Sequence, residues 1–162
     1  MSYADLLENA LRPERWAKIK WAAKRIPFRG FDSIGTLKHS FLDQLGFYAI
    51  VSGDYVLYVG IAWKKGRTLR KRITEPHDSY EAINGWLGKN DADAEIMLGA
   101  LVDCPQKRPS KQLREDAERV LILDNDVVFG ADYEPREDMH VENVGSHRPF
   151  ERVSAWSSKE DE

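Results

Sequence analysis

The fold of this chain is decided by residues 46–60, whose sequence is GFYAIVSGDYVLYVG. Two runs rich in β-branched and aromatic residues flank Ser52-Gly53-Asp54, a pattern typical of a β-hairpin. We predict that these three residues form the loop, because Tyr48 then lies directly opposite Tyr58 on one face of the hairpin. A loop of only Gly53 and Asp54 would place the two tyrosines on opposite faces, since side chains alternate along a strand.

Length and composition limit what else the chain can contain. With 162 residues, 42% of them hydrophobic, it is long enough for one domain with a core. Its apolar runs are far shorter than the ~20 residues that cross a bilayer, and its N-terminus lacks the apolar segment of a signal peptide. We therefore expect a cytoplasmic protein without a membrane partner. Cys104 is the only cysteine, which excludes an intrachain disulfide and a cysteine-rich zinc site.

Positive charge is concentrated in residues 1–40 and 61–80, although the formal net charge of the whole chain is −3. The second of these regions contains the segment Leu69-Arg70-Lys71-Arg72-Ile73. Local basic patches attract polyanions such as DNA. Ordinary solvated helix faces have a similar composition, and charge alone favours that interpretation.

The first 30 residues are expected to be helical, with one apolar stripe and a basic face beside it. Such a helix could pack on the domain, pair two copies of the chain in a homodimer, or lie along a phosphate backbone. The predicted stripe consists of Trp16, Ile19, Ala23 and Ile26.

Further elements are expected after the hairpin. Ser110 is a suitable N-cap for a helix that ends near Leu123. The sequence also predicts a short helix over residues 67–74, a helix over 79–87 and a third strand over 94–104.

The order of these segments resembles the GIY-YIG nuclease superfamily. Gly46-Phe47-Tyr48 stands for the first sequence block and Tyr58-Val59-Gly60 for the second, and the basic segment follows them. The resemblance, which spans roughly residues 45–125, implies an α/β (α+β) fold: a small three-stranded antiparallel sheet flanked by helices. To this the chain would add an N-terminal helical segment. The expected division is a basic helical extension (1–40), a GIY-YIG-like catalytic domain (41–150) and a disordered acidic tail (151–162).

The resemblance also implies roles for individual residues. Tyr48 matches the tyrosine that activates or orients the attacking water, and Tyr58 the one that hydrogen-bonds water or phosphate. A phenol has a reference pKa near 10 and needs a nearby cation to act as a base. Arg72 is the best match to the arginine that neutralises charge on the phosphate. Because the preceding loop is longer than in the family pattern, Arg70 and Arg67 stay open as alternatives.

Three more positions complete the implied site. His77 matches a histidine that serves the nucleophile or leaving group, although a solvated loop residue is an equal alternative. Glu118 matches the glutamate that binds one Mg²⁺ or Mn²⁺ ion, the alternative being a surface pair with Arg114. Asn143 is a weak match to the family asparagine, for which Asn125 comes too early. The residues expected to bind nucleic acid are Lys64, Lys65, Arg67, Arg70 and Lys71.

We therefore expect a metal-dependent endonuclease that hydrolyses phosphodiester bonds in DNA, most readily double-stranded DNA. The longer loop and the displaced asparagine indicate an alternative from another class: a catalytically inactive module that binds nucleic acid or a protein. A third interpretation is nucleotide binding by residues 60–68. This segment resembles a phosphate-binding P-loop but has one residue too many and arginine in place of lysine.

Overall fold

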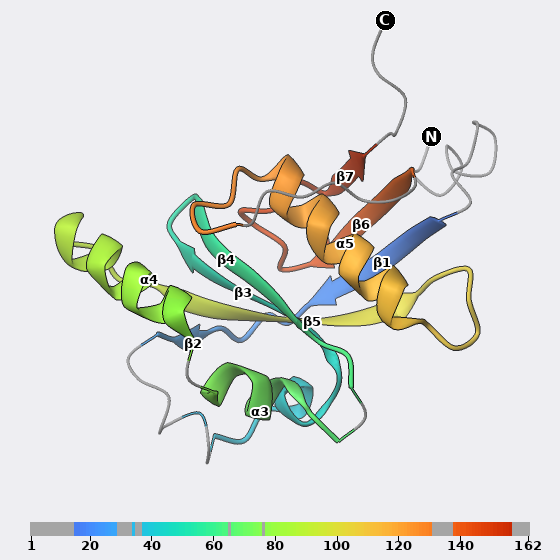
Figure 1. The fold of residues 1–162 in the computed structure, drawn as a ribbon, viewed down its shortest axis with the longest axis horizontal. Coiled ribbons are helices and arrows are strands. Elements are labelled where there is room, and N and C mark those ends of the chain that lie inside the picture. Colours follow the sequence, from blue (N-terminus) through green and yellow to red (C-terminus); the bar gives the residue numbers. More distant parts are fainter. Residues whose placement is uncertain are drawn as a thin grey trace, which may run out of the picture.

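The structure, a computed structural model, describes residues 15–28, 34, 37–64, 66–75, 77–130 and 138–156. It is a mixed α+β protein (Figure 1). The strands are β1 (Arg15–Trp21), β2 (Ile26–Pro27), β3 (Gly46–Ser52), β4 (Tyr55–Ala62), β5 (Glu95–Asp103), β6 (Met139–Gly145) and β7 (Val153–Trp156). The helices are the 3-10 helix η1 (Ser40–Asp43) and the α-helices α3 (Leu69–Thr74), α4 (Asp78–Lys89) and α5 (Lys111–Asp124).

The strands form one seven-stranded sheet in the order β4-β3-β5-β1-β6-β7, with β2 also paired to β5. The neighbouring strands are antiparallel except for β1 and β6, which are parallel. The β4-β3-β5 unit has the antiparallel pairing that the resemblance implies. It is nevertheless only part of a larger sheet, and the prediction of a small three-stranded sheet is therefore wrong.

The prediction of an N-terminal helix is also wrong, because Arg15–Trp21 is a strand between β5 and β6. Its burial follows a period of two: Ala17, Ile19 and Trp21 are buried, while the alternating positions are more exposed. The apolar residues also fit a helical stripe, but the alternation with lysine fits a strand whose one face is buried. The predicted homodimer was to form through this helix, but the described part of the segment is a strand inside the sheet. Residues 1–14 lie outside the described residues.

The predicted acidic tail begins within the sheet. Val153–Trp156 forms β7, which pairs antiparallel with β6. The rest of the predicted tail, residues 157–162, lies outside the described residues.

The β3–β4 hairpin differs from the predicted register. Ser52 pairs with Tyr55, so the loop consists of Gly53 and Asp54, and Gly53 has a φ of +57°, a conformation that glycine adopts without steric cost. Farther along, Val51 pairs with Val56 but Ile50 pairs with Tyr58. Leu57 is therefore an extra residue, a β-bulge that shifts the alternation of β4 by one position.

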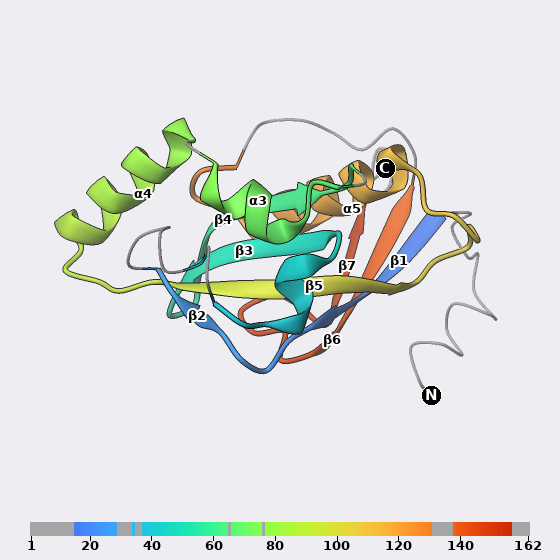
Figure 2. The same cartoon turned by 90° about the horizontal axis from the view of Figure 1, so that it is seen from below.

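Two apolar layers lie on the two faces of the sheet. One contains alternate residues of β3 together with Leu113, Ala117, Val120 and Leu121 of α5. The other contains Tyr48 and Ile50 with buried residues of α3 and α4, and η1 lies against α3 (Figure 2). Among the described residues, no helix combines the length and the apolar character needed to span a membrane.

Candidate functional site

Tyr48 and Tyr58 lie side by side on one face of the sheet. Their ring centroids are 5.8 Å apart, and both pack in the layer that contains α3 and α4. The predicted proximity is confirmed, but the predicted cause is wrong. The two-residue loop alone would separate the tyrosines, and the bulge at Leu57 brings Tyr58 back to the face of Tyr48. They are diagonal neighbours, because Tyr48 pairs with Gly60 and Tyr58 with Ile50.

Gly60 makes room for the ring of Tyr48. A Cβ atom at position 60 would lie 2.4 Å from Cε1 of Tyr48 and 2.7 Å from its hydroxyl oxygen. The tyrosine ring thus lies across the glycine of the opposite strand, and any side chain at position 60 would overlap the ring. The glycine of the second sequence block therefore has a packing role that depends on the tyrosine of the first block.

Tyr80 of α4 also belongs to this cluster, although it is not among the site residues predicted from the sequence. Its hydroxyl oxygen is 3.2 Å from that of Tyr48, and its ring contacts the rings of Tyr58 and His77. The signal that could have identified it is helical spacing, since Tyr80 follows His77 by three positions at the start of α4 and thus lies on the same side.

His77 connects this cluster to the start of α4. It is the N-cap residue, and its Nδ1 accepts a hydrogen bond from the backbone N–H of Ser79 at 3.1 Å. Because Nδ1 accepts, the neutral ring carries its proton on Nε2. Nε2 lies 3.2 Å from the hydroxyl oxygen of Tyr58 and donates to it. Burial, with the charge of Arg72, lowers the pKa of His77, which favours this neutral form.

The two tyrosines differ in access to solvent. Tyr48 is fully buried, and burial together with Tyr80 and Tyr58 raises its pKa far above the ordinary value. Tyr58 is only partly buried. Burial raises its pKa, while Arg72 and the hydrogen bond with Tyr48 act in the opposite direction. Tyr58 is therefore the tyrosine that can contact a water or a substrate, and the buried ring of Tyr48 packs beside it.

Arg72 is the arginine whose charge reaches the cluster. It opposes the rise in the pKa of Tyr48, Tyr58 and Tyr80 and contributes to lowering that of His77. Its guanidinium is partly exposed and lies 3.8 Å from a carboxylate oxygen of Glu75. A cation placed at the open side of the tyrosines can neutralise a bound phosphate.

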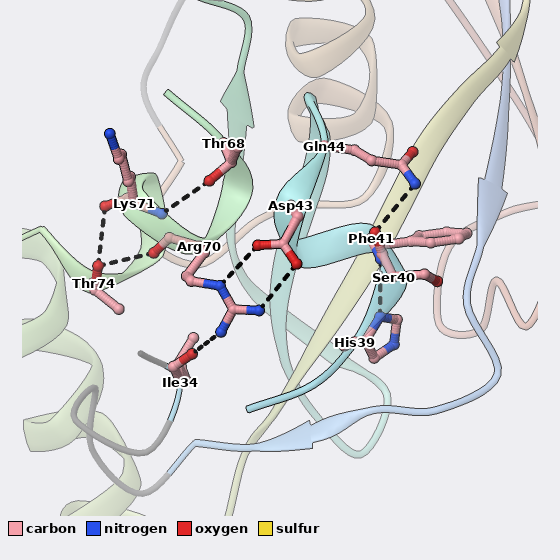
Figure 3. Close-up of polar contacts among 10 residues, drawn as sticks. All are labelled: Ile34, His39, Ser40, Phe41, Asp43, Gln44, Thr68, Arg70, Lys71 and Thr74. Carbon is pink, nitrogen blue, oxygen red and sulfur yellow. Dashed lines mark hydrogen bonds and ion pairs between the residues drawn. The ribbon is translucent and has the colours of Figure 1, made fainter. Parts of the chain in front are cut away.

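Arg70 has a different, structural environment (Figure 3). Its guanidinium donates to both carboxylate oxygens of Asp43, at 3.0 and 3.3 Å, and to the carbonyl oxygen of Ile34 at 2.6 Å. This pairing lowers the pKa of Asp43. Positions 70 and 72 are about 200° apart around a helix, so Arg70 ties α3 to η1 while Arg72 projects from another side. The geometry favours Arg72 over Arg70 as the phosphate-binding arginine.

Glu118 approaches the cluster from the other layer. Its helix, α5, packs in the layer opposite to the tyrosines and contacts β4. The carboxylate is nevertheless close enough to contribute to raising the pKa of Tyr58. This is possible because β4 is the outermost strand of the sheet, so that side chains from both faces can converge at its edge.

Glu118 fits a metal ion that keeps most of its water ligands. Within the described ranges, no three or more His, Cys, Asp or Glu side chains gather in a metal-binding group. Mg²⁺ is commonly held by one or two carboxylates, with waters and substrate phosphates as the other ligands. A single partly exposed carboxylate near Tyr58 has the right donor chemistry for that arrangement, and it does not fit a closed structural site.

Asn143 lies apart from the tyrosines. It is buried on β6, where its amide oxygen accepts from the indole N–H of Trp21 at 2.9 Å and its amide nitrogen donates to the carbonyl oxygen of Glu151 at 2.7 Å. Three strand spacings of about 4.8 Å separate β6 from β3. Asn125 donates to the carbonyl oxygen of Leu121 and accepts from the backbone N–H of Glu151. Both asparagines stabilise the second half of the sheet.

The expected nucleic-acid-binding residues have varied environments. Lys64 and Lys71 are exposed, Arg67 forms an ion pair with Glu75, and Arg70 is bound as described above. Lys65 lies outside the described residues.

No family model, no curated protein and no solved structure matches the chain. Membership of the GIY-YIG superfamily therefore stays a prediction that rests on the residues and their geometry.

Proposed function

We propose that the chain is a metal-dependent endonuclease of the GIY-YIG type that hydrolyses phosphodiester bonds in DNA. The observation that carries the proposal is the convergence of Tyr48, His77, Arg72 and Glu118 on Tyr58, from separate elements of the chain. Each residue alone has an ordinary structural explanation. Together the partly exposed side chains of Tyr58, Arg72 and Glu118 supply a hydrogen-bonding oxygen, a cation and a hard anionic ligand near β4, and these are the groups that phosphate ester hydrolysis requires.

Hydrolysis adds the hydroxyl of a water molecule to phosphorus and its remaining proton to the leaving oxygen. Tyr58 would hold the attacking water, because its side chain is partly exposed and its oxygen accepts a hydrogen bond from the Nε2–H of His77. Arg72 would bind the phosphate oxygens and neutralise the charge that grows on them. Tyr48 and Tyr80, joined at 3.2 Å, would keep the ring of Tyr58 in position.

Glu118 would hold Mg²⁺ or Mn²⁺, and a bound ion would supply further charge neutralisation on a phosphate oxygen. The role that the resemblance implies for Tyr48, direct activation of water, is given to Tyr58 in this proposal. Tyr48 is completely buried and the cause of its raised pKa is that burial, so a neutral supporting role suits it better.

The test is nicking of supercoiled plasmid by the purified protein, with Mg²⁺, with Mn²⁺ and with a chelator. We expect nicking that depends on the metal and that falls at least ~100-fold in Glu118→Gln, the size of effect seen when one group that stabilises the transition state is removed. Glu115→Gln is the matched control, since Glu115 lies on the same helix and pairs only with Lys111 and Arg119 among the ion pairs described.

Nicking that is equal in Glu118→Gln and wild type would contradict the proposed role of Glu118. Salt-dependent binding of DNA without cleavage in either metal would instead establish the inactive binding module.

A further inference from the structure

A small hollow adjoins the candidate site where β4 ends and the chain turns toward α3. It has a volume of about 60 Å³ and shares Arg72 with the site. Its lining combines an aromatic ring with three cationic side chains: Ile61, Ala62, Trp63, Lys64, Arg67 and Arg72. An aromatic face beside several cations is suited to bind a nucleotide, because the flat base can stack on the ring and the phosphate can pair with the cations.

Two of these cations are bridged by a single carboxylate. One oxygen of Glu75 contacts the guanidinium of Arg67, and its other oxygen lies 3.8 Å from that of Arg72. The three side chains are 35%, 48% and 31% exposed, in the order Glu75, Arg67 and Arg72. Ion pairs this exposed are weak and exchange readily. The carboxylate thus occupies a place between two guanidiniums that a phosphodiester group, which carries the same charge on two similar oxygens, can take instead.

The aromatic ring at this hollow is open. Trp63 is 38% exposed, and the ammonium group of Lys111 lies 4.3 Å from the centroid of its ring. The side chain of Lys111 is itself 53% exposed, so a flexible charged group, and not packed apolar side chains, covers that face of the indole. A lysine in this position can move to a neighbouring phosphate when a base takes its place.

A second aromatic pair lies elsewhere on the surface. Exposed Tyr55, at the tip of the hairpin, contacts half-buried Trp86 of α4 beside a larger hollow of about 480 Å³. The charged residue that lines that hollow is Asp54, which repels phosphate. Of the two aromatic surfaces, only the one at Trp63 is combined with cations.

We propose that Arg67 joins Arg72 in binding the phosphate that is cut, displacing Glu75, and that Trp63 stacks on the base of the nucleotide carrying that phosphate. The inference rests on the proposed function, because it takes Arg72 as the ligand of the phosphate. A base can lie flat on Trp63 only when it is outside the base-paired stack. The substrate class that follows is DNA with an unpaired nucleotide at the cutting position: single strands, frayed ends or branch points.

The test measures binding of a short fluorescent oligothymidylate and of a blunt duplex by anisotropy, in chelator so that nothing is cut. Trp63→Ala should weaken binding of the single strand by about 5-fold or more, leave duplex binding unchanged and leave the salt dependence unchanged. Arg67→Ala should weaken binding and reduce the slope of log K against log salt by about 0.7. Glu75→Gln should tighten binding about 2- to 5-fold, since a competing anion is removed.

Matched controls separate these effects from general changes. Glu81→Gln removes the same charge from an exposed position of α4, and Tyr55→Ala removes an aromatic ring that is 62% exposed; neither should change the affinities. Equal effects of Glu75→Gln and Glu81→Gln, or equal losses for single strand and duplex in Trp63→Ala, would overturn the inference.

The inference and the proposed function can fail separately. If the predicted binding differences appear but plasmid and frayed DNA are never cut, the nuclease function is wrong and the nucleotide site stands. If DNA is cut but Trp63→Ala keeps the wild-type ratio of frayed to blunt cleavage, the nucleotide site is wrong and the nuclease function stands.

Discussion

Replacing Gly60 by alanine should disturb the tyrosine cluster by direct overlap. The new Cβ would lie 2.4 Å from Cε1 and 2.5 Å from Cζ of Tyr48, about 1 Å closer than ordinary van der Waals contact. The ring cannot withdraw freely, because Tyr48 is completely buried and bounded by Tyr58 and Tyr80. Overpacking of this kind costs about 1–3 kcal/mol.

A smaller opposing term comes from the unfolded chain. Alanine has less conformational freedom than glycine, which stabilises the folded state by about 0.4–1 kcal/mol where the backbone allows it. We therefore expect Gly60→Ala to lower the free energy of unfolding by about 1–2 kcal/mol, equivalent to about 2–8 °C in Tm for a chain of this size. Gly85→Ala is the control: nothing lies within 4 Å of its new Cβ, so it should stabilise α4 by about 0.5–1 kcal/mol.

The assay is urea unfolding of a double-mutant cycle with Tyr48→Leu. Leucine lacks the ring atoms that the new Cβ would meet, so Gly60→Ala should be nearly neutral or slightly stabilising in that background. The coupling energy between the two substitutions should be about 1–2 kcal/mol. If Gly60→Ala is as stable as wild type, or costs the same with leucine at position 48, the close packing of ring on glycine is refuted.

Three further predictions concern the polar groups. The pKa of His77 in the folded protein lies below the reference value of 6.5, chiefly because of burial. As the pH falls, the unfolded chain therefore binds a proton before the folded protein does, and the stability decreases below about pH 6.5. His77→Asn keeps an N-cap oxygen but cannot titrate. In urea titrations, the unfolding free energy of the wild type should therefore exceed that of the variant by less at pH 5.5 than at pH 7.5. The same difference at both pH values would contradict this prediction. Tyr80→Phe removes the hydroxyl partner of Tyr48 and should cost about 1 kcal/mol in thermal unfolding, whereas no loss would mean that this bond is unimportant. Asn143→Ala leaves the buried indole N–H of Trp21 without its acceptor and should cost about 1–3 kcal/mol with the nicking rate preserved; lost nicking at preserved stability would place Asn143 in the site.

The elements that could be predicted from the sequence are those with local signals. Ser110 accepts from the backbone N–H of Leu113 as an N-cap should, and α5 begins directly after it. Local patterns likewise predict the third strand and the helices after the hairpin near their observed bounds. These signals depend on residues within a few positions of one another, which a single sequence displays directly.

The N-terminal strand shows where local signals end. Residues 15–21 fit both a helical stripe and a strand alternation, and the choice is made by partners far along the chain. Lys20 pairs with Ala100 on one side and with Val144 on the other. Backbone pairing over such sequence separations stabilises β1 in the interior of the sheet. The residues of the segment itself do not indicate these two partner strands.

The sequence predicts the shared face of the two tyrosines, but for the wrong reason. The requirement that Tyr48 and Tyr58 share a face is met, but by a two-residue loop and a compensating bulge at Leu57. The hairpin pattern does not reveal this bulge, because β4 is apolar or aromatic at nearly every position and a shift in its alternation leaves no visible break. Tyr80 was missed since its role depends on the approach of α4 to β3, which is a tertiary contact.

The central claim is that Tyr58 and Arg72 act together on one phosphate. Single-turnover nicking rates should be measured for wild type, Tyr58→Phe, Arg72→Lys and the double variant, at saturating Mg²⁺. Groups that act as a unit give strongly non-additive losses, so the double variant should be about as slow as the slower single variant. Rates in Tyr58→Phe and Arg72→Lys that equal the wild-type rate, or a wild type that never nicks DNA, would contradict the claim.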